Sequence, residues 1–335
     1  MTLRTPLLAL ALCSTALPVL ADEVNIYSHR QPELLQPLID AFTAETGIAV
    51  NVAFVDKGMV ERLVAEGDRS PADLVLTVDI ARLMQVVDAG VTQAVQSDVL
   101  EANIPSAFRD PADQWFGLTS RARIVYAARD RVADGEVTTY EDLASDKWKG
   151  RLCTRSGTND YNVALAAAML AHKGPEATKT WLEGLKANLA KKPDGGDRDQ
   201  VKAIWAGECD ISLGNTYYMG QMMGSEEQKA WADSVRIVFP VFEGDGTHMN
   251  ISGVAMTKAA PNKPAALTLM EWLSSDAAQA IYAETNHEFP VKPGVPLSAL
   301  VAGWGSFTPD SLGLSDVAAQ RPAALKLIEE VNFDG

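Results

Sequence analysis

Hydrophobic residues after residue 22 alternate between a strand-like and a helix-like spacing. Short apolar stretches with the composition of buried strands occur at residues 23–28, 48–55 and 72–78. Stretches with apolar residues at the three- and four-residue spacing of an amphipathic helix occur at residues 32–47, 58–67 and 80–90. Strand and helix therefore alternate along this part of the chain, which predicts a parallel sheet with helices on both faces.

A second set of elements follows the segment at residues 114–130, which itself contains the first of the strands below. Strand-like stretches lie at residues 124–128, 151–155, 209–215, 234–241 and 251–258. Helix-like stretches lie at residues 160–172, 175–189, 200–208, 264–275, 276–285 and 322–331. A chain of 335 residues is too long for one ordinary hydrophobic core, so we expect two lobes of the α/β class. The first would contain residues 22–122 plus about 247–290, and the second residues 123–246 plus about 291–335.

The first 21 residues have the pattern of a secretory signal peptide. Arg4 precedes an apolar run at residues 7–17, and small residues end at Ala21, where we expect cleavage. The run is too short for a comfortable membrane span. A lipoprotein anchor at Cys13 is disfavoured, because Leu12 stands where that signal has glycine or alanine. These features predict a soluble, exported protein that begins at Asp22.

Two cysteines, Cys153 and Cys209, remain after removal of the leader. In an oxidising compartment they allow a single bridge, which we predict, the alternative being two free buried thiols. The formal charge of −15 and the isoelectric point near 4.7 argue against nucleic acid as a partner, since that needs basic surface.

Three segments lie where a predicted strand passes into a predicted helix. They are YSHRQPE, TRSGTNDYN and GNTYYMG. Open α/β sheets bind ligands beyond the carboxyl ends of their strands, and helix N-termini favour negative charge. The second segment contains Tyr161, and the third contains the adjacent pair Tyr217 and Tyr218. If the two lobes face each other, these side chains meet in the cleft between them.

Adjacent tyrosines at the start of a helix diverge by only about 100°, so both can reach one ion. Tyrosinate oxygen is a hard donor that suits a hard cation, and three phenolates neutralise one Fe3+. The alternative is a pair of ordinary packing aromatics. The sequence has no zinc-like histidine spacing, no EF-hand loop and no CxxC pair. Met219, Met222 and Met223 are expected to pack behind the tyrosines, because thioether sulfur is a poor ferric ligand.

The chain resembles the bacterial periplasmic ferric-ion-binding proteins, the iron-carrying subunits of ABC importers. The resemblance rests on VNIYSHRQPELLQPLIDAF, EGDRSPADLVLTVDIARL, GLTSRARIVY, KWKGRLCTRSG, GNTYYMG and NISGVAM. It implies a transferrin-like, two-lobed binding protein of type II. Each lobe would be a mixed, mostly parallel sheet flanked by helices, with the ligand in the cleft. It also implies that Tyr161, Tyr217 and Tyr218 bind Fe3+ as phenolates.

Members of this family complete the iron shell in different ways. The histidine and glutamate that some members use would fall at Gln31 and Val78 here, so both are missing. A branch that uses tyrosines with carbonate or bicarbonate fits this sequence better. Its anion would be held by Arg30, Gln31 and Arg121, with Arg123 as the alternate arginine.

Five further residues are weaker candidates for the site. Ser156 is a candidate donor to the anion or beside the metal, together with the neighbouring Gly157 and Thr158. Water, His29 or Tyr27 is left open as the group that completes the iron shell, although Tyr27 is expected to be a core residue on the first strand.

The resemblance implies a periplasmic carrier that delivers Fe3+ to a membrane permease. The chain has no GxxxxGK[ST] motif, so ATP hydrolysis belongs to a partner subunit. We expect a monomer. The alternative is a protein of the same fold that carries an oxyanion, thiamine or a polyamine. An enzyme is disfavoured, because no GxSxG or HExxH motif occurs.

Overall fold

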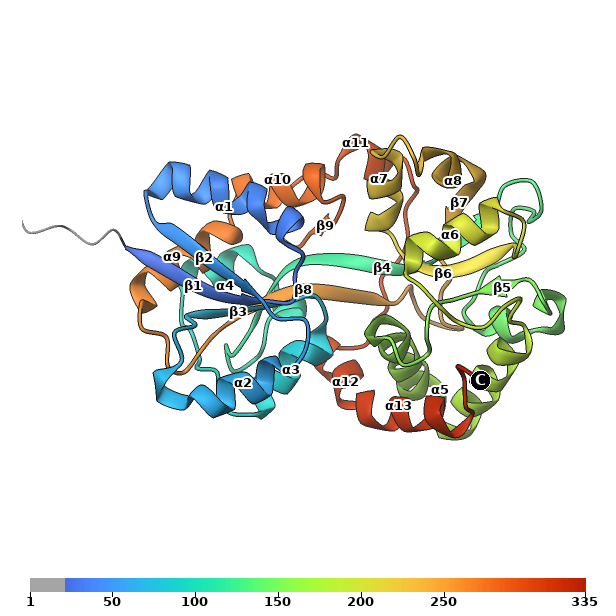
Figure 1. Cartoon of the computed structure of the whole chain (residues 1–335), viewed down its shortest axis with the longest axis horizontal. Coiled ribbons are helices and arrows are strands. Elements are labelled where there is room, and N and C mark those ends of the chain that lie inside the picture. The colour runs from blue at the N-terminus through green and yellow to red at the C-terminus, as the bar shows by residue number, and fades with distance from the viewer. Residues whose placement is uncertain (1–21) are drawn as a thin grey trace, which may run out of the picture.

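One long strand, β4 (Phe116–Ala128), belongs to two different sheets (Figure 1). Its first part pairs with β8 (Met249–Met256) and β9 (Phe289–Pro290), and its second part with β6 (Ile211–Asn215) and β7 (Val235–Val238). Every residue of β4 is buried. The computed structural model describes residues 22–335 and has the two-lobed α/β architecture predicted from the sequence, with β4 passing through both lobes. The predicted signal peptide lies outside the described residues.

The sheets are mixed. In the first lobe β1 (Glu23–Ser28) lies between β2 (Ala49–Phe54) and β3 (Leu74–Thr77) and is parallel to both. In the second lobe only β5 (Leu152–Cys153) and β6 are parallel. The other pairs are antiparallel, so the expectation of mostly parallel sheets is corrected. Strand β4 runs from the first lobe into the second, and β8 runs back beside it. These two long strands are therefore antiparallel.

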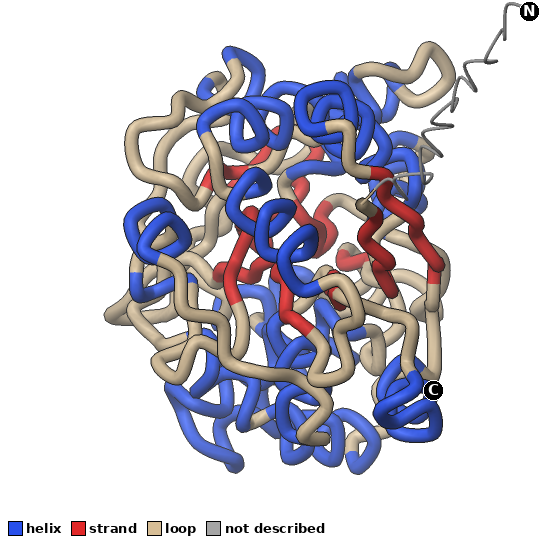
Figure 2. Tube along the Cα trace, turned by 90° about the vertical axis from the view of Figure 1, so that its left-hand side faces the viewer, coloured by secondary structure: helices blue, strands red, loops and turns tan. Residues whose placement is uncertain are grey.

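Helices lie over the faces of the sheets, and most strands lie inside, although the edge strand β2 has no buried residue (Figure 2). Those around the first sheet are α1 (Pro32–Thr46), α2 (Met59–Glu66), α3 (Ile80–Asp88), α4 (Asp98–Asn103), α9 (Lys263–Leu273) and α10 (Asp276–Thr285). Those around the second are α5 (Asp160–Ala187), α6 (Asp197–Trp205), α7 (Tyr217–Met223), α8 (Lys229–Ser234), α11 (Ala299–Ala302), α12 (Leu314–Ala319) and α13 (Arg321–Glu330). None of the helices within residues 22–335 is both long enough and apolar enough to cross a membrane.

The helix boundaries follow local sequence signals. Helix α1 begins at Pro32 and ends at Thr46, and the C-cap residue Gly47 has a left-handed φ of 74°. Helix α5 is interrupted at Gly174 (φ 78°, ψ 174°), which precedes Pro175, so its two parts match the two helices predicted there. The short elements α4, α11 and α12 were not predicted, because so few residues give no periodic pattern.

Each lobe has its own hydrophobic core. The core of the first lobe draws its residues from 24–118 and 254–291, and that of the second lobe mainly from 122–242 and 317–333. A smaller cluster joins the two, since Leu314 and Ala318 of α12 pack against Ile80 and Leu83 of α3. The C-terminal segment therefore contacts the first lobe through α12, while α13 lies along α5 (Figure 1).

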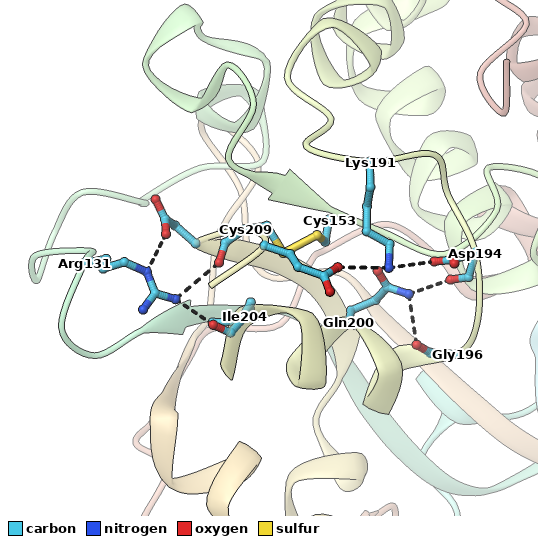
Figure 3. The surroundings of a disulfide bond; sticks show 10 residues. Arg131, Cys153, Lys191, Asp194, Gly196, Gln200, Ile204 and Cys209 are labelled. Carbon is cyan, nitrogen blue, oxygen red and sulfur yellow. Dashed lines mark hydrogen bonds and ion pairs between the residues drawn. A yellow bond between two sulfur atoms is a disulfide. The ribbon is translucent and has the colours of Figure 1, made fainter. Parts of the chain in front are cut away.

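A disulfide joins Cys153 to Cys209, as predicted (Figure 3). It ties the end of β5 to the residues that lead into β6, the neighbouring strand. Each cysteine stands eight residues before a tyrosine that opens a helix, Tyr161 or Tyr217. The bridge therefore holds two strand-to-helix segments in register.

Replacement of both cysteines by serine should lower the free energy of unfolding by about 4 kcal/mol, because the bridge closes a loop spanning 56 residues. Urea unfolding followed by circular dichroism measures this difference. The unaltered protein with a reductant present throughout unfolding should lose a similar amount, and the double variant should not respond to the reductant. Equal stability of the variant and the oxidised protein would contradict a stabilising bridge.

Candidate metal centre

A cavity of about 240 Å³ lies between the lobes. The first lobe contributes residues 29–31, Val78, Asp79, Arg82, Arg121 and Glu288, among others. The second lobe contributes Arg155, residues 159–161, Tyr217 and Tyr218. All three segments that the sequence placed at strand-to-helix junctions therefore reach one cavity.

Two helix N-termini bring the tyrosines together. Asn159 caps α5 by accepting a hydrogen bond of 3.1 Å from the amide of Tyr161. Tyr217 and Tyr218 are the first residues of α7, and their ring centroids lie 4.3 Å apart. The hydroxyl oxygens of Tyr161 and Tyr217 are 3.3 Å apart. We call Tyr161, Tyr217 and Tyr218 the phenol cluster.

Burial raises the pKa of all three hydroxyls above the ordinary tyrosine value of 10.0, and neighbouring phenols add to the increase. Arg121 opposes it at Tyr161 and Tyr217, and Arg155 at Tyr218, but the net direction is upward. At neutral pH the cluster is therefore three uncharged phenols. A cation of high charge is what would replace their protons.

Arg30 and Arg121 face the cavity from the first lobe, and both are bound to a carboxylate that the sequence did not reveal. Glu288, 1% exposed, accepts hydrogen bonds from both guanidinium groups, that of Arg121 at 2.8 Å. The hydroxyl of Ser252 accepts from both as well, from Arg30 at 2.7 Å. The Nε atoms of Arg30 and Arg121 are buried and have no partner within residues 22–335. Gln31 also lines the cavity and makes no side-chain cap for α1.

The alternate arginine, Arg123, lies behind the phenol cluster and does not line the cavity. It donates to Asp197 at 2.9 Å and to Asn162 at 2.6 Å, and its guanidinium carbon lies 5.8 Å from the ring centre of Tyr161. Arg155, which does line the cavity, pairs with the other oxygen of Asp197 at 3.3 Å. Arg121 therefore lines the cavity and Arg123 does not, and the role of Arg121 in holding an anion stays a prediction.

Ser156 is not brought to the cavity. Its hydroxyl donates to Asp334 at 2.5 Å, and the amide of Gly157 donates to the same carboxylate at 2.7 Å. Thr158 also lies off the cavity wall, with its hydroxyl 2.8 Å from that of Ser156. The prediction that this loop donates to the anion is thus corrected: the loop is occupied by the C-terminal residues.

The remaining candidate residues differ in whether they reach the cavity. His29 lines the cavity, and burial together with Arg82 lowers its pKa to about 4, so its imidazole is neutral at pH 7. Tyr27 is a core residue, 3% exposed, whose hydroxyl donates to Glu66 at 2.8 Å. Met219 and Met222 pack in the second core as expected, whereas Met223 is partly exposed.

One ion pair crosses the cleft beside the phenol cluster. Asp160, the residue before Tyr161, accepts a hydrogen bond of 2.7 Å from Nε of Arg82 on α3 and pairs with Arg321 on α13. Its pKa is lowered, because these two arginines outweigh the effect of burial. The first lobe therefore contacts the start of the helix that carries Tyr161.

Comparison with known proteins gives a consistent result. The model of the family described as bacterial extracellular solute-binding protein matches residues 37–309. The iron uptake protein A1 of Synechocystis sp. is 44% identical over 316 residues, which cover 93% of this chain and 88% of that protein. The Fe(3+)-binding periplasmic protein of Serratia marcescens is 26% identical and covers 82% of this chain and 80% of its own length.

Solved structures agree with these relatives. The apo ferric ion-binding protein A of Pasteurella haemolytica superposes with a TM-score of 0.91 at 55% identity, covering 94% of this chain and 99% of its own. A Trichodesmium protein solved with iron and citrate ligands superposes with a TM-score of 0.87 at 40% identity, covering 93% of this chain and 99% of its own.

The close packing of α7 against the segment that carries Glu288 gives a test of this geometry. A Cβ added at Gly220 would lie 2.1 Å from Cδ2 of His287, whose φ of 57° is already unfavourable. Gly220→Ala should therefore lower the free energy of unfolding by about 1–3 kcal/mol, measured by urea titration.

Gly224→Ala is the matched control on the same helix, because its Cβ would meet only backbone oxygens at 3.6 and 3.7 Å. We expect it to change the stability by less than about 0.5 kcal/mol or to raise it slightly. Equal losses in both variants would show that the contact between Gly220 and His287 is not the cause.

Proposed function

This chain belongs to the bacterial extracellular solute-binding protein family, and we propose that it captures Fe3+ in the periplasm for an ABC importer. The metal is cargo that is bound and later released. The ligands are the phenolate oxygens of Tyr161, Tyr217 and Tyr218. The permease and the ATPase that hydrolyses ATP are separate partner proteins, and the carrier acts as a soluble monomer.

The observation that carries the proposal is the convergence of three phenol oxygens, from two helix N-termini, on one cavity between the lobes. Phenolate is a hard anionic ligand. Three phenolates balance the charge of one hard trivalent cation completely. Some members of the family have a histidine ligand and a glutamate ligand at two positions where this chain has Gln31 and Val78. Both of these residues line the cavity. Neither position therefore supplies the histidine or the glutamate ligand that some family members use.

A carbonate or bicarbonate ion completes the site in this proposal. Arg30 and Arg121 line the cavity, and the buried Nε atom of each has no hydrogen-bond partner within residues 22–335. An arginine matches a planar carboxylate-like anion through paired donors. The side-chain amide of Gln31 is a further donor on the same wall. We call Arg30, Gln31 and Arg121 the anion half of the site.

The two halves belong to different lobes, so binding is coupled to closure. The proposed division assigns residues 22–122 and about 247–290 to one lobe and 123–246 and about 291–335 to the other. The strands β4 and β8 then form the hinge, and the carrier closes on the ion by rotation about them.

Iron-loaded protein should be coloured, because ferric tyrosinates absorb strongly in the visible. Replacement of both Tyr217 and Tyr218 by phenylalanine should abolish the band on addition of ferric citrate, measured by absorption spectroscopy. Tyr27→Phe is the control, since Tyr27 is buried but does not line the cavity. Colour that persists in the double variant would refute the ligand assignment, and a colourless unaltered protein would refute the iron proposal.

Acid should release the iron. In the iron-free protein each phenol keeps its proton at all pH values below its raised pKa, whereas each iron-bound oxygen has lost it. Binding therefore releases one proton per ligand, so the apparent affinity should fall about 1,000-fold per pH unit between pH 8 and 5.

Competition with a chelator, corrected for the chelator's own protonation, measures this slope. Tyr161→Phe should release one proton fewer, so its affinity should fall only about 100-fold per pH unit. A slope that is the same in both proteins would contradict ligation by Tyr161.

A further inference from the structure

Glu288 is a buried carboxylate that the proposed ligand set does not use. It stands at the wall of the cavity, 1% exposed, and bridges the guanidinium groups of Arg30 and Arg121. Both arginines are far from Glu288 in the sequence: Arg30 lies 258 positions before it and Arg121 lies 167 positions before it. A charged group is buried at a cost unless it is paired, and here one carboxylate satisfies two cations.

The position of Glu288 is fixed from three sides. The side chain of Asn286 donates to the carbonyl of Leu34 on α1 at 3.0 Å, and the amide of Glu288 donates to Tyr282 on α10 at 3.3 Å. His287, between them, lies against Gly220 of α7. The next residue, Phe289, enters β9 and pairs with Ser120 of β4, beside Arg121. The backbone therefore places this carboxylate relative to α1, β4 and α7 together.

The charge of the anion half follows from these contacts. Two guanidinium groups and one carboxylate leave a net charge of +1. Burial raises the pKa of Glu288, but Arg30 and Arg121 outweigh it and hold that pKa below the usual range, so the carboxylate is ionised at neutral pH. Fe3+ and three phenolates together are neutral. Within the anion half, one monovalent anion thus balances the two arginines with Glu288, whereas a divalent anion balances the two arginines without that carboxylate.

We propose that Glu288 is a positioning and selectivity residue: it holds Arg30 and Arg121 at the cavity and sets a preference for a singly charged anion. The inference rests on the proposed anion half of the site. Glu288 accepts hydrogen bonds from both arginines, and the buried Nε atom of each arginine has no partner in the part of the chain that the structure describes. A cavity that carries this carboxylate therefore attracts divalent oxyanions weakly, and both guanidinium groups stay in place for bicarbonate.

The experiment uses the iron-free mature protein and sulfate, a dianion of fixed charge. Isothermal titration calorimetry at pH 7 would measure the sulfate affinity of the unaltered protein, of Glu288→Gln and of Asp210→Asn. Asp210 is the matched control, because it also bridges two arginines, Arg131 and Arg151, each at 2.6 Å, but it does not line the cavity. We expect Glu288→Gln to bind sulfate at least tenfold more tightly than the other two. Equal affinities in the three proteins would overturn the proposal.

Glu288→Asp separates charge from position, and it also serves if Glu288→Gln does not fold. It keeps the negative charge on a shorter side chain, so sulfate affinity should stay within threefold of the unaltered protein. The bicarbonate concentration that gives half of the maximal ferric colour should rise at least threefold, because the arginines are no longer held at the cavity. An unchanged bicarbonate requirement would overturn the positioning role.

These outcomes are separable from failure of the iron proposal. If no protein, including the unaltered one, becomes coloured with Fe3+, the proposed function fails. The sulfate titration needs no iron and still decides whether Glu288 sets the charge preference of the cavity.

Discussion

Three phenols gathered at one cavity, with Tyr217 buried and Tyr161 and Tyr218 partly buried, are the constraint on which the rest of the site depends. The hydroxyl oxygens of Tyr161 and Tyr217 are 3.3 Å apart, and two negative charges at that separation repel by about 5 kcal/mol at an effective dielectric constant near 20. The phenol cluster is therefore stable either as three neutral groups or around a cation that compensates for all of them. Burial, which raises the pKa of each tyrosine, enforces this choice and disfavours ions of low charge.

The residues that set the electrostatics of the cavity also position its walls. Three carboxylates each bridge two arginines around it, in the groups Arg30–Glu288–Arg121, Arg82–Asp160–Arg321 and Arg123–Asp197–Arg155. Asp160 opens the helix that carries Tyr161. Asp197 accepts from the amide of Asn215, at the end of the strand before the tyrosine pair, at 2.9 Å. Each group thus carries net positive charge and also fixes the position of one wall of the cavity. The same residues therefore determine both the charge around the site and the positions of its side chains.

What the sequence predicted well was local. Patterns among neighbouring residues predicted the helices, the strands and the tyrosines at helix starts. Elimination predicted the disulfide, because only two cysteines follow the leader. Glu288 was missed, because nothing within a few positions of it indicates that Arg30 would lie beside it. Ser156 was misassigned for the same kind of reason: its partner is Asp334, 178 residues away. The expected sheet direction was wrong in part because period and length do not reveal that β4 and β8 run between lobes.

In the proposed function, capture and release depend on one motion, and the course of β4 gives the reason. Arg121 pairs across from Asn250 in the first sheet, and Arg123, two residues on, pairs across from Asn215 in the second. A hinge between them, as the proposed lobe division has it, leaves the anion half with one lobe and the phenol cluster with the other. Opening then breaks the Arg82–Asp160 pair and separates the anion from the iron. It also admits water to the phenolates, whose high pKa in the iron-free state favours their reprotonation and thereby the loss of the ion.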